Sequence, residues 1–197
     1  MKVLNYGSLN VDYVYSVDHI IVGGETQHSS KLEVFSGGKG LNQSIALAKA
    51  GVPVYHAGIV GTDGDILLEA CKEAGVNTKY IRRLPVKGGH TMIQVDKNAQ
   101  NCIILYGGTN QMQTKEFVDE VLADFGEGDY LMLQNEINML DYIIDQAYEK
   151  KMKIVMNPSP FDDKLSTCDL SKVYLFLVNE IEGEQITGCK DKDQILD

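Results

Sequence analysis

Residues 36–44, Ser-Gly-Gly-Lys-Gly-Leu-Asn-Gln-Ser, combine a glycine-rich turn with a lysine and an amide. Three glycines within four residues do not suit the interior of a helix or strand, because glycine loses the most conformational freedom on folding. The small, apolar residues 45–50 favour a helix, and Gly51 can end it. The pattern predicts a turn into a helix N-terminus whose free N–H groups suit an anion or a hydroxyl group. Lys39 and Asn42 add a cation and an amide there.

Two well-known phosphate-binding motifs do not match this chain. A Walker A loop requires a glycine six residues before its lysine and a Ser or Thr directly after it. In this chain, position 33 is glutamate and Lys39 is followed by glycine. The dinucleotide fingerprint requires Gly-x-Gly-x-x-Gly after the first strand, where this chain has Gly7-Ser8-Leu9-Asn10. A glycine-rich loop with no ligand remains the alternative for residues 36–44.

The composition narrows the classes of protein to consider. Of the 197 residues, 44% are hydrophobic and 23% are charged, as in ordinary globular proteins, and the net charge is −10. This negative charge argues against a general nucleic-acid surface or binding to an anionic membrane. The four cysteines lack paired spacing, which disfavours a disulfide framework or a zinc site. No apolar run approaches ~20 residues, and no signal peptide is evident, so we expect a cytoplasmic protein.

Helix and strand patterns alternate along most of the chain. A first strand is predicted within residues 2–9, and a helix over 40–50 leads to an apolar strand at 54–60. Asp63 is predicted to cap the next helix, which ends at Gly75. The same alternation predicts later helices around 117–125 and 140–147 and strands at 130–133, 154–156 and 174–178. Repeated units of this kind predict a parallel sheet with helices on both faces.

Other segments predict a second, smaller sheet. Residues 11–17 alternate in period two, and residues 28–35 form a weaker strand pattern after a Gly-Gly turn. Residues 91–95 and 102–106 flank a polar turn and predict a hairpin that joins this small sheet.

Polar residues recur where the strands of the main sheet are predicted to end. They occur at 8–12, 135–136, 157 and 179–180. Ligands of parallel sheets bind at the carboxyl ends of the strands. We therefore expect these positions to form one binding site together with the glycine-rich turn.

These motifs, in this order, resemble the ribokinase (PfkB-type) family of carbohydrate kinases, and most of all its ribokinase branch. The resemblance covers the whole chain, which corresponds to roughly the N-terminal two thirds of a typical member. The motifs that carry it are Gly7–Asp12, Gly24–Thr26, Gly37–Ser44, Leu133–Glu136, Asn157–Pro160 and Val178–Glu182.

The resemblance implies a fold, a domain organisation and an activity. The expected fold is a three-layer α/β/α, Rossmann-like arrangement with a mostly parallel sheet and a small β-sheet lid. One ribokinase-like domain would cover residues 1–197, with lid segments at about 11–36 and 88–107. The implied activity is transfer of the ATP γ-phosphate to the primary hydroxyl of a sugar, with ribose favoured. The alternatives are a kinase for another sugar such as fructose or for a nucleoside, and a truncated, non-catalytic sugar-binding remnant.

The resemblance also implies roles for particular residues. Magnesium and ATP would be required, with potassium as an optional further ion, and a homodimer would form through the lid. No nucleic-acid or membrane partner is implied. Asn179 would help to bind the nucleotide phosphates, and Glu182 would help to bind the metal. The residues expected to bind the sugar are Asn10, Asp12, Gly38, Lys39, Asn42 and Glu136.

One departure from the family pattern bears on catalysis. The second family signature, Asp-Thr-x-Gly-Ala-Gly-Asp, does not occur in these 197 residues. Its last aspartate is the catalytic base of the family. We therefore assign no catalytic residue in this chain and expect no turnover from these 197 residues alone.

Each candidate residue also has a purely structural interpretation. Asp12 could face solvent from a strand, and Lys39 could be a solvated loop residue. Glu136 could cap the helix that follows it, and Asn179 with Glu182 could form a helix start with acids in its first turn.

Overall fold

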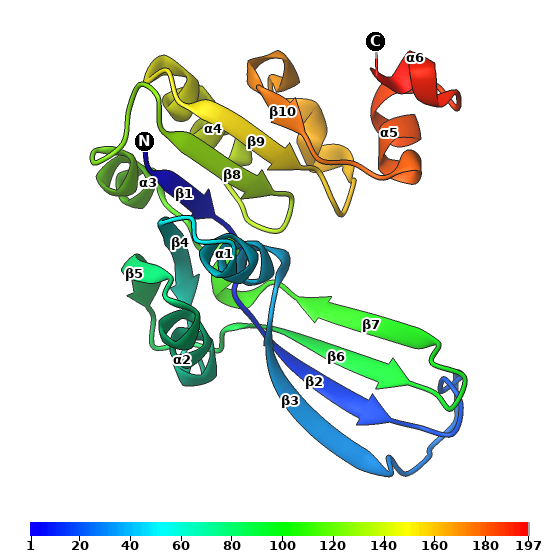
Figure 1. Cartoon of the computed structure of the whole chain (residues 1–197). Coiled ribbons are helices and arrows are strands. Elements are labelled where there is room, and N and C mark those ends of the chain that lie inside the picture. Colours follow the sequence, from blue (N-terminus) through cyan, green and yellow to red (C-terminus); the bar gives the residue numbers. More distant parts are fainter. Residues whose placement is uncertain (197) are drawn as a thin grey trace.

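The computed structural model describes residues 1–196 and contains two β-sheets (Figure 1). The larger sheet is parallel, with strand order β10-β9-β8-β1-β4-β5. Its strands are β1 (Val3–Tyr6), β4 (Val54–Val60), β5 (Asn77–Arg83), β8 (Tyr130–Gln134), β9 (Lys153–Asn157) and β10 (Leu175–Phe176). The smaller sheet is mixed and projects away from the larger one, with strand order β3-β2-β6-β7.

The helices lie around the larger sheet (Figure 1). The α-helices are α1 (Lys39–Lys49), α2 (Asp65–Ala74), α3 (Lys115–Leu122), α4 (Leu140–Glu149), α5 (Glu180–Thr187) and α6 (Lys192–Leu196). Three short 3-10 helices complete the set, η1 (Gly108–Gln111), η2 (Asp163–Thr167) and η3 (Leu170–Lys172). Within residues 1–196, no helix is both long and apolar enough to cross a membrane.

Alternation along the strands divides the core between the two faces of the larger sheet. Leu4 and Tyr6 of β1 are fully buried and pack in one cluster with the apolar sides of α3 and α4. Val54 and Val60 of β4 point to the other face, where they pack with Leu67 of α2 and the apolar side of α1. Helices therefore cover both faces, and the predicted three-layer α/β/α fold is confirmed.

Two sequence-based expectations about this sheet need correction. The strand β5 was not predicted, because its sequence Asn-Thr-Lys-Tyr-Ile-Arg-Arg is polar and Tyr80 is its one buried residue. It lies at an edge of the sheet, where few side chains need to be apolar. Asp63 does not cap α2, whose N-cap residue is Gly64. Instead, the Asp63 carboxylate accepts a hydrogen bond from the Gly88 N–H at 2.9 Å and pairs with Lys87 at 2.6 Å.

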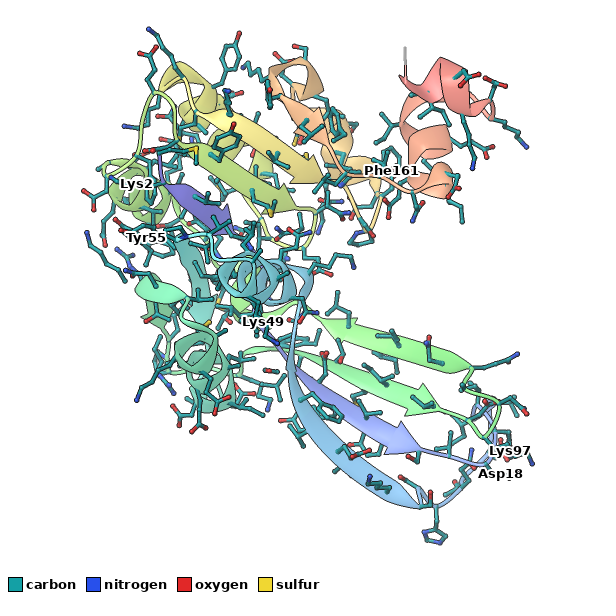
Figure 2. The ribbon with its side chains drawn as sticks, in the orientation of Figure 1. Lys2, Asp18, Lys49, Tyr55, Lys97 and Phe161 are labelled. Atoms are coloured by element: carbon teal, nitrogen blue, oxygen red, sulfur yellow. The ribbon has the colours of Figure 1, made fainter. Side chains whose placement is uncertain are left out.

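The small sheet consists of β2 (Asn10–Ser16), β3 (Lys31–Gly37), β6 (Gly89–Val95) and β7 (Asn101–Tyr106). The strand β2 pairs antiparallel with β3 and parallel with β6, and β6 pairs antiparallel with β7. The predicted hairpin therefore joins the earlier strands. Figure 2 shows Asp18 and Lys97 together at the far tip of this sheet, where they form an ion pair of 3.0 Å between two loops.

A buried polar network attaches α1 to the larger sheet. The Asn5 amide nitrogen donates to the Gly40 carbonyl at 2.7 Å and to the Ser44 hydroxyl at 2.8 Å. The Ser44 hydroxyl lies 2.7 Å from His56 Nδ1. Because the Ser44 hydroxyl accepts a hydrogen bond from Asn5, it can donate one to His56, whose Nδ1 must then be unprotonated. Complete burial lowers the pKa of His56 to about 4.

We expect His56 to make the folded chain sensitive to acid. Its pKa in the folded chain lies below the value near 6.5 of an unfolded histidine. The stabilising contribution is therefore complete above pH ~6.5 and is lost as the pH falls toward 4, a change on the order of 3 kcal/mol. NMR titration of the four histidine rings measures this directly, with the other three histidines as internal references. A His56 ring that titrates near pH 6.5 would contradict the prediction.

Candidate functional site

The candidate residues come from three segments that the fold brings to one end of the larger sheet. The neighbouring strands β1 and β8 run parallel, so the segment after β1 and the segment after β8 emerge side by side. The first carries Ser8 and Asn10 into β2, and the second carries Glu136. The third segment is the start of α1, which follows directly on β3 and begins after Gly38.

The start of α1 packs directly on the backbone after β1. Gly38 has a φ of 98°, which favours glycine. A Cβ atom at Gly40 would lie 2.4 Å from the Ser8 nitrogen, so only glycine fits. The close approach lets the Gly40 N–H donate to the Ser8 hydroxyl at 3.2 Å and the Leu41 N–H donate to the Ser8 carbonyl at 3.0 Å.

The expectation of free N–H groups at this helix start was wrong. Besides the two groups bound to Ser8, the Lys39 N–H donates to Glu136 Oε2 at 3.0 Å. The first turn of α1 is thus satisfied by the protein itself, through residues distant in the sequence. The groups offered to a ligand are therefore chiefly side chains.

Glu136 and Lys39 form the main charged pair of the site. Lys39 Nζ lies 3.0 Å from Glu136 Oε1, and the Ser8 hydroxyl also donates to the Glu136 carboxylate. The Glu136 side chain is only 8% exposed, whereas that of Lys39 is 41% exposed. A nearly buried carboxylate needs such partners to offset its loss of hydration. Glu136 does not cap the helix that follows it, because α4 begins at Leu140 with Met139 as its N-cap residue.

Asp12 lies on the same face of β2 as Asn10. Its Oδ1 atom accepts a hydrogen bond from the Thr91 hydroxyl at 2.7 Å, across the parallel pair β2–β6. Burial raises the pKa of Asp12, the Thr91 hydrogen bond opposes this shift, and the nearby Glu136 charge adds to it. Asp12 is therefore a partly desolvated carboxylate and not a solvent-facing strand residue.

All six residues proposed for the sugar border one cavity of about 320 Å³. Its volume is at the small end of the range of ligand cavities, roughly 300–1,000 Å³. The small sheet contributes both apolar and polar side chains to the lining, and the other lining residues come from the start of α1 and from the segments after β8 and β9. The lining residues are Asn10, Asp12, Gly38, Lys39, Asn42, Thr91, Ile93, Ile103, Leu105, Glu136 and Pro160.

A second hollow of about 280 Å³ shares Lys39 and Asn42 with this cavity and is also lined by Glu182. Asn179 borders neither space. Its side chain accepts a hydrogen bond from the Glu182 N–H at 2.9 Å, and the Glu182 carboxylate accepts from the Asn179 N–H at 3.1 Å. These two residues form a capping box at the start of α5, as their structural interpretation predicted.

Two residues of the site were missed at the level of sequence. Thr91 binds Asp12, and Asn110 of η1 binds Asn10 at 2.7 Å. Thr91 lies 79 residues from Asp12 in the sequence, and Asn110 lies 100 residues from Asn10. The only sequence signal for Asn110 is its place after the Gly107-Gly108 pair that ends the hairpin.

Solved structures share this architecture. The ribokinase from Cryptococcus neoformans var. grubii serotype A in complex with ADP superposes with a TM-score of 0.82 at 28% identity, over 99% of this chain and 64% of that one. The ribokinase from Thermotoga maritima gives a TM-score of 0.83 at 29% identity, over 95% of this chain and 62% of that one. The protein therefore has the ribokinase-like α/β fold.

Its sequence identifies the family. The model of the pfkB family of carbohydrate kinases matches residues 1–197, and the chain belongs to that family. The ribokinase of Staphylococcus aureus (strain COL) is 34% identical over 195 residues, which are 96% of this chain. The chain spans 64% of the length of that relative.

We expect Asp12→Asn to stabilise the folded chain at neutral pH. Because the pKa of Asp12 is raised by folding, this carboxyl favours the folded state only when protonated, below the ordinary range near pH 4. That contribution is lost as the pH rises through the raised pKa. The amide should therefore increase the free energy of unfolding at pH 7, by less than ~1 kcal/mol because the group is partly solvated.

Urea unfolding at pH 7 and pH 3.5 tests this. The difference in the free energy of unfolding between Asp12→Asn and wild type should be smaller at pH 3.5. The matched control is Asp18→Asn. Hydrogen bonds from Lys97 and His19 lower the pKa of exposed Asp18, so this amide should not stabilise the chain. An Asp12→Asn chain less stable than wild type at pH 7 would contradict the prediction.

Proposed function

We propose that this chain is the sugar-binding part of an ATP-dependent sugar kinase, with ribose as the favoured sugar. The observation that supports this best is the cavity on which Asn10, Asp12, Lys39, Asn42 and Glu136 converge. A monosaccharide carries hydroxyl groups around its ring and C–H groups on its faces. The cavity offers both kinds of surface, since amides and charged groups line it together with Ile93, Ile103 and Leu105.

Each polar side chain has a role suited to its chemistry. Asp12 uses one carboxylate oxygen for Thr91, and the other can accept from a sugar hydroxyl. The carboxylate is partly desolvated, so such hydrogen bonds are strong. Asn42 at the rim and Lys39 can donate to hydroxyl oxygens. Glu136 is a further acceptor, provided that the sugar takes over part of the role of Lys39 and Ser8.

The proposed mechanism depends on orientation. Lys39 and Asn42 border both the cavity and the adjoining hollow, so a sugar held by them has a hydroxyl near that hollow. We propose that the hollow receives the ATP phosphates, with Lys39 balancing part of their charge. Holding the sugar hydroxyl and the phosphoryl donor together in this way can lower the entropic part of the barrier to phosphoryl transfer. We assign the catalytic base to none of these residues and expect no turnover from residues 1–197 alone.

The donor set in the adjoining hollow fits a magnesium ion that is bound mainly through the nucleotide. Among residues 1–196, no three His, Cys, Asp or Glu side chains gather into a metal site. Magnesium usually keeps water ligands and binds one or two carboxylates together with substrate phosphates. Glu182 borders the hollow and could supply one carboxylate, with Asn179 orienting it through the capping box. When bound, magnesium would neutralise developing charge on the phosphates. Potassium remains part of the proposal through the family resemblance alone.

The alternatives differ in substrate or in activity. Another sugar such as fructose, or a nucleoside, would require a different set of hydroxyl contacts in the same cavity. A non-catalytic chain would bind sugar without transferring phosphate. The ribokinase names of the relatives at 28–34% identity favour ribose. We also propose a cytoplasmic location, where ATP is available.

We expect Asp12→Asn to weaken sugar binding while leaving the fold intact. Loss of a hydrogen bond to a charged group should cost about 1.5–3 kcal/mol, or roughly ten- to 150-fold in Kd. Calorimetric titration with D-ribose, D-fructose and adenosine ranks the candidate ligands, and Asp18→Asn at the far tip of the small sheet is the matched control. Unchanged affinity would remove Asp12 from the site. Failure of the wild-type chain to bind any of the three would contradict the proposed function.

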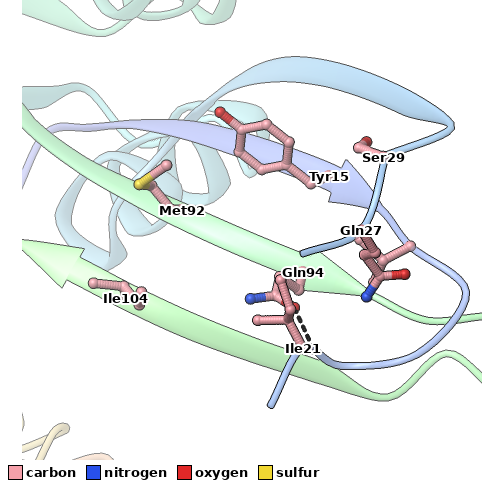
Figure 3. Close-up of a pocket in the computed structure, with 8 residues that line it drawn as sticks. Tyr15, Ile21, Gln27, Ser29, Met92, Gln94 and Ile104 are labelled. Carbon is pink, nitrogen blue, oxygen red and sulfur yellow. Dashed lines mark hydrogen bonds between the residues drawn. The ribbon is translucent and has the colours of Figure 1, made fainter. Parts of the chain in front are cut away.

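We further propose that the small sheet is a lid over the cavity and that two copies of the chain pair through it. Its edge strand β7 is exposed at every residue, including Ile103, Ile104 and Leu105. An apolar groove of about 210 Å³ lies on the face that carries Tyr15, Met92 and Ile104, and Figure 3 shows the side chains that line it. Apolar surface on both faces of one small sheet is unusual unless another molecule covers it.

For this dimer, we expect light scattering at high micromolar concentration to give twice the mass of the chain. Ile104→Glu should shift the protein toward monomer, because it puts a charge in the groove. Ile181→Glu is the matched control, since Ile181 is 70% exposed on α5 rather than on the small sheet. A wild-type chain that is strictly monomeric would contradict the proposal.

A further inference from the structure

We propose that Asn110 is a positioning residue of the sugar site, which sets the direction of the Asn10 amide and thereby the hydrogen bond that Asn10 offers to the sugar. The inference rests on the proposed function, since it concerns the same cavity. Asn110 does not border the cavity, and its side chain acts through Asn10.

The side chain of Asn110 is held by three hydrogen bonds. Its Oδ1 accepts from the Leu9 N–H at 3.0 Å, and its Nδ2 lies 3.4 Å from the Leu9 carbonyl and 2.7 Å from Asn10 Oδ1. Asn110 is 1% exposed and Asn10 is 3% exposed, so little water competes for these groups. The side-chain amide thus pairs with the backbone at the junction between β1 and β2.

These contacts determine which atom of Asn10 faces the cavity. A backbone N–H can only donate, so Leu9 fixes the oxygen of Asn110 on its own side. The Asn110 nitrogen must then point to Asn10, where only the side-chain oxygen can accept. The Asn10 oxygen is thereby occupied, and its NH₂ group is left for a ligand. The site therefore presents a donor at Asn10 and an acceptor at Asp12, two residues apart on one face of β2.

The surrounding backbone is shaped to admit this pair. A Cβ atom at Gly89 would lie 2.2 Å from Asn110 Nδ2 and 2.4 Å from Asn10 Oδ1. Gly89 begins β6, Asn10 begins β2, and Asn110 follows the end of β7. Three of the connections between the small sheet and the larger one thus meet at this hydrogen bond. The direction of the Asn10 amide is consequently linked to the position of the small sheet relative to the larger one.

The chain contains a matched control for the experiment. Asn138 makes the same double pairing with a backbone, since its Oδ1 accepts from the Gln113 N–H at 2.9 Å and its Nδ2 donates to the Gln113 carbonyl at 3.0 Å. Within residues 1–196, its side chain makes no hydrogen bond to Asn10 or to another residue that borders the cavity. Its backbone N–H donates to the Asn110 carbonyl at 3.3 Å, and Asn138→Asp leaves that backbone contact in place. A purely structural role would make the two asparagines equivalent.

The test compares Asn110→Asp with Asn138→Asp. An aspartate keeps the size of the side chain and can still accept from the backbone N–H, but it has no NH₂ group for the Asn10 oxygen. We expect Asn110→Asp to weaken the tightest-binding ligand of the D-ribose, D-fructose and adenosine panel about tenfold, the scale of one hydrogen bond. Asn138→Asp should stay within about twofold of wild type. In an Asn10→Ala background, Asn110→Asp should add little, because its effect passes through Asn10.

Crystal structures of the wild-type, Asn110→Asp and Asn138→Asp chains without sugar give a readout that does not depend on binding or on the stability of the variants in solution. We expect Asn10 to turn its NH₂ group toward position 110 only in the Asn110→Asp chain. Neutron diffraction on these crystals shows this, because the amide deuterons distinguish the nitrogen of Asn10 from its oxygen. If the wild-type chain binds no ligand of the panel, the proposed function fails, and the direction of Asn10 still decides the role of Asn110. Equal affinity losses for the two variants, or an Asn10 oxygen that still faces position 110 in Asn110→Asp, would overturn the inference.

Discussion

The site depends on the contact between the start of α1 and the backbone that leaves β1. At Gly40, a Cβ would lie 2.4 Å from the Ser8 nitrogen, and at Gly7 it would lie 2.1 Å from Gln134 Oε1. With both side chains absent, the two segments touch, and the Gly40 and Leu41 N–H groups donate to the hydroxyl and the carbonyl of Ser8. The buried amide of Asn5 binds the same helix through hydrogen bonds to the Gly40 carbonyl and the Ser44 hydroxyl. This contact sets the height of Lys39 and Asn42 above β2, and so the shape of the cavity. Any side chain at Gly40 would separate the two walls of the site.

The free site holds charge at some cost in stability. Two carboxylates, Asp12 and Glu136, are close enough for Glu136 to raise the pKa of Asp12, and both are partly or largely removed from water. Glu136 is compensated by Lys39 and Ser8, whereas the Asp12 side chain has, among the described residues, only the Thr91 hydroxyl as a hydrogen-bond partner. Such incomplete compensation is typical of binding sites, where a ligand completes the hydrogen bonding. The residues that would give the highest ligand affinity at these positions are therefore not those that would give the ligand-free chain its highest stability.

Local patterns were sufficient to predict most of the fold, because helix and strand periods and glycine positions are properties of neighbouring residues. They failed for β5, whose edge position lets charged residues such as Arg82 and Arg83 occupy a strand. They also failed at the start of α1, because the partners of its N–H groups lie about 30 and 100 residues away. The six residues proposed for the sugar were recognisable because they belong to motifs with a set spacing. Thr91 and Asn110 were not, because their roles exist only once β2, β6 and η1 are side by side.

The pairing of Lys39 with Glu136 has a consequence for the divergence of this site. If Lys39 were replaced by a neutral residue, Glu136 would keep its burial and lose its charged partner, and the converse change would leave Lys39 with no nearby carboxylate in this contact. Either single substitution passes through a less favourable intermediate, whereas a joint substitution to two neutral residues does not. The residues at positions 39 and 136 should therefore vary together among proteins with this architecture. When such a protein evolves to bind another ligand, substitutions at the two positions should follow one another closely.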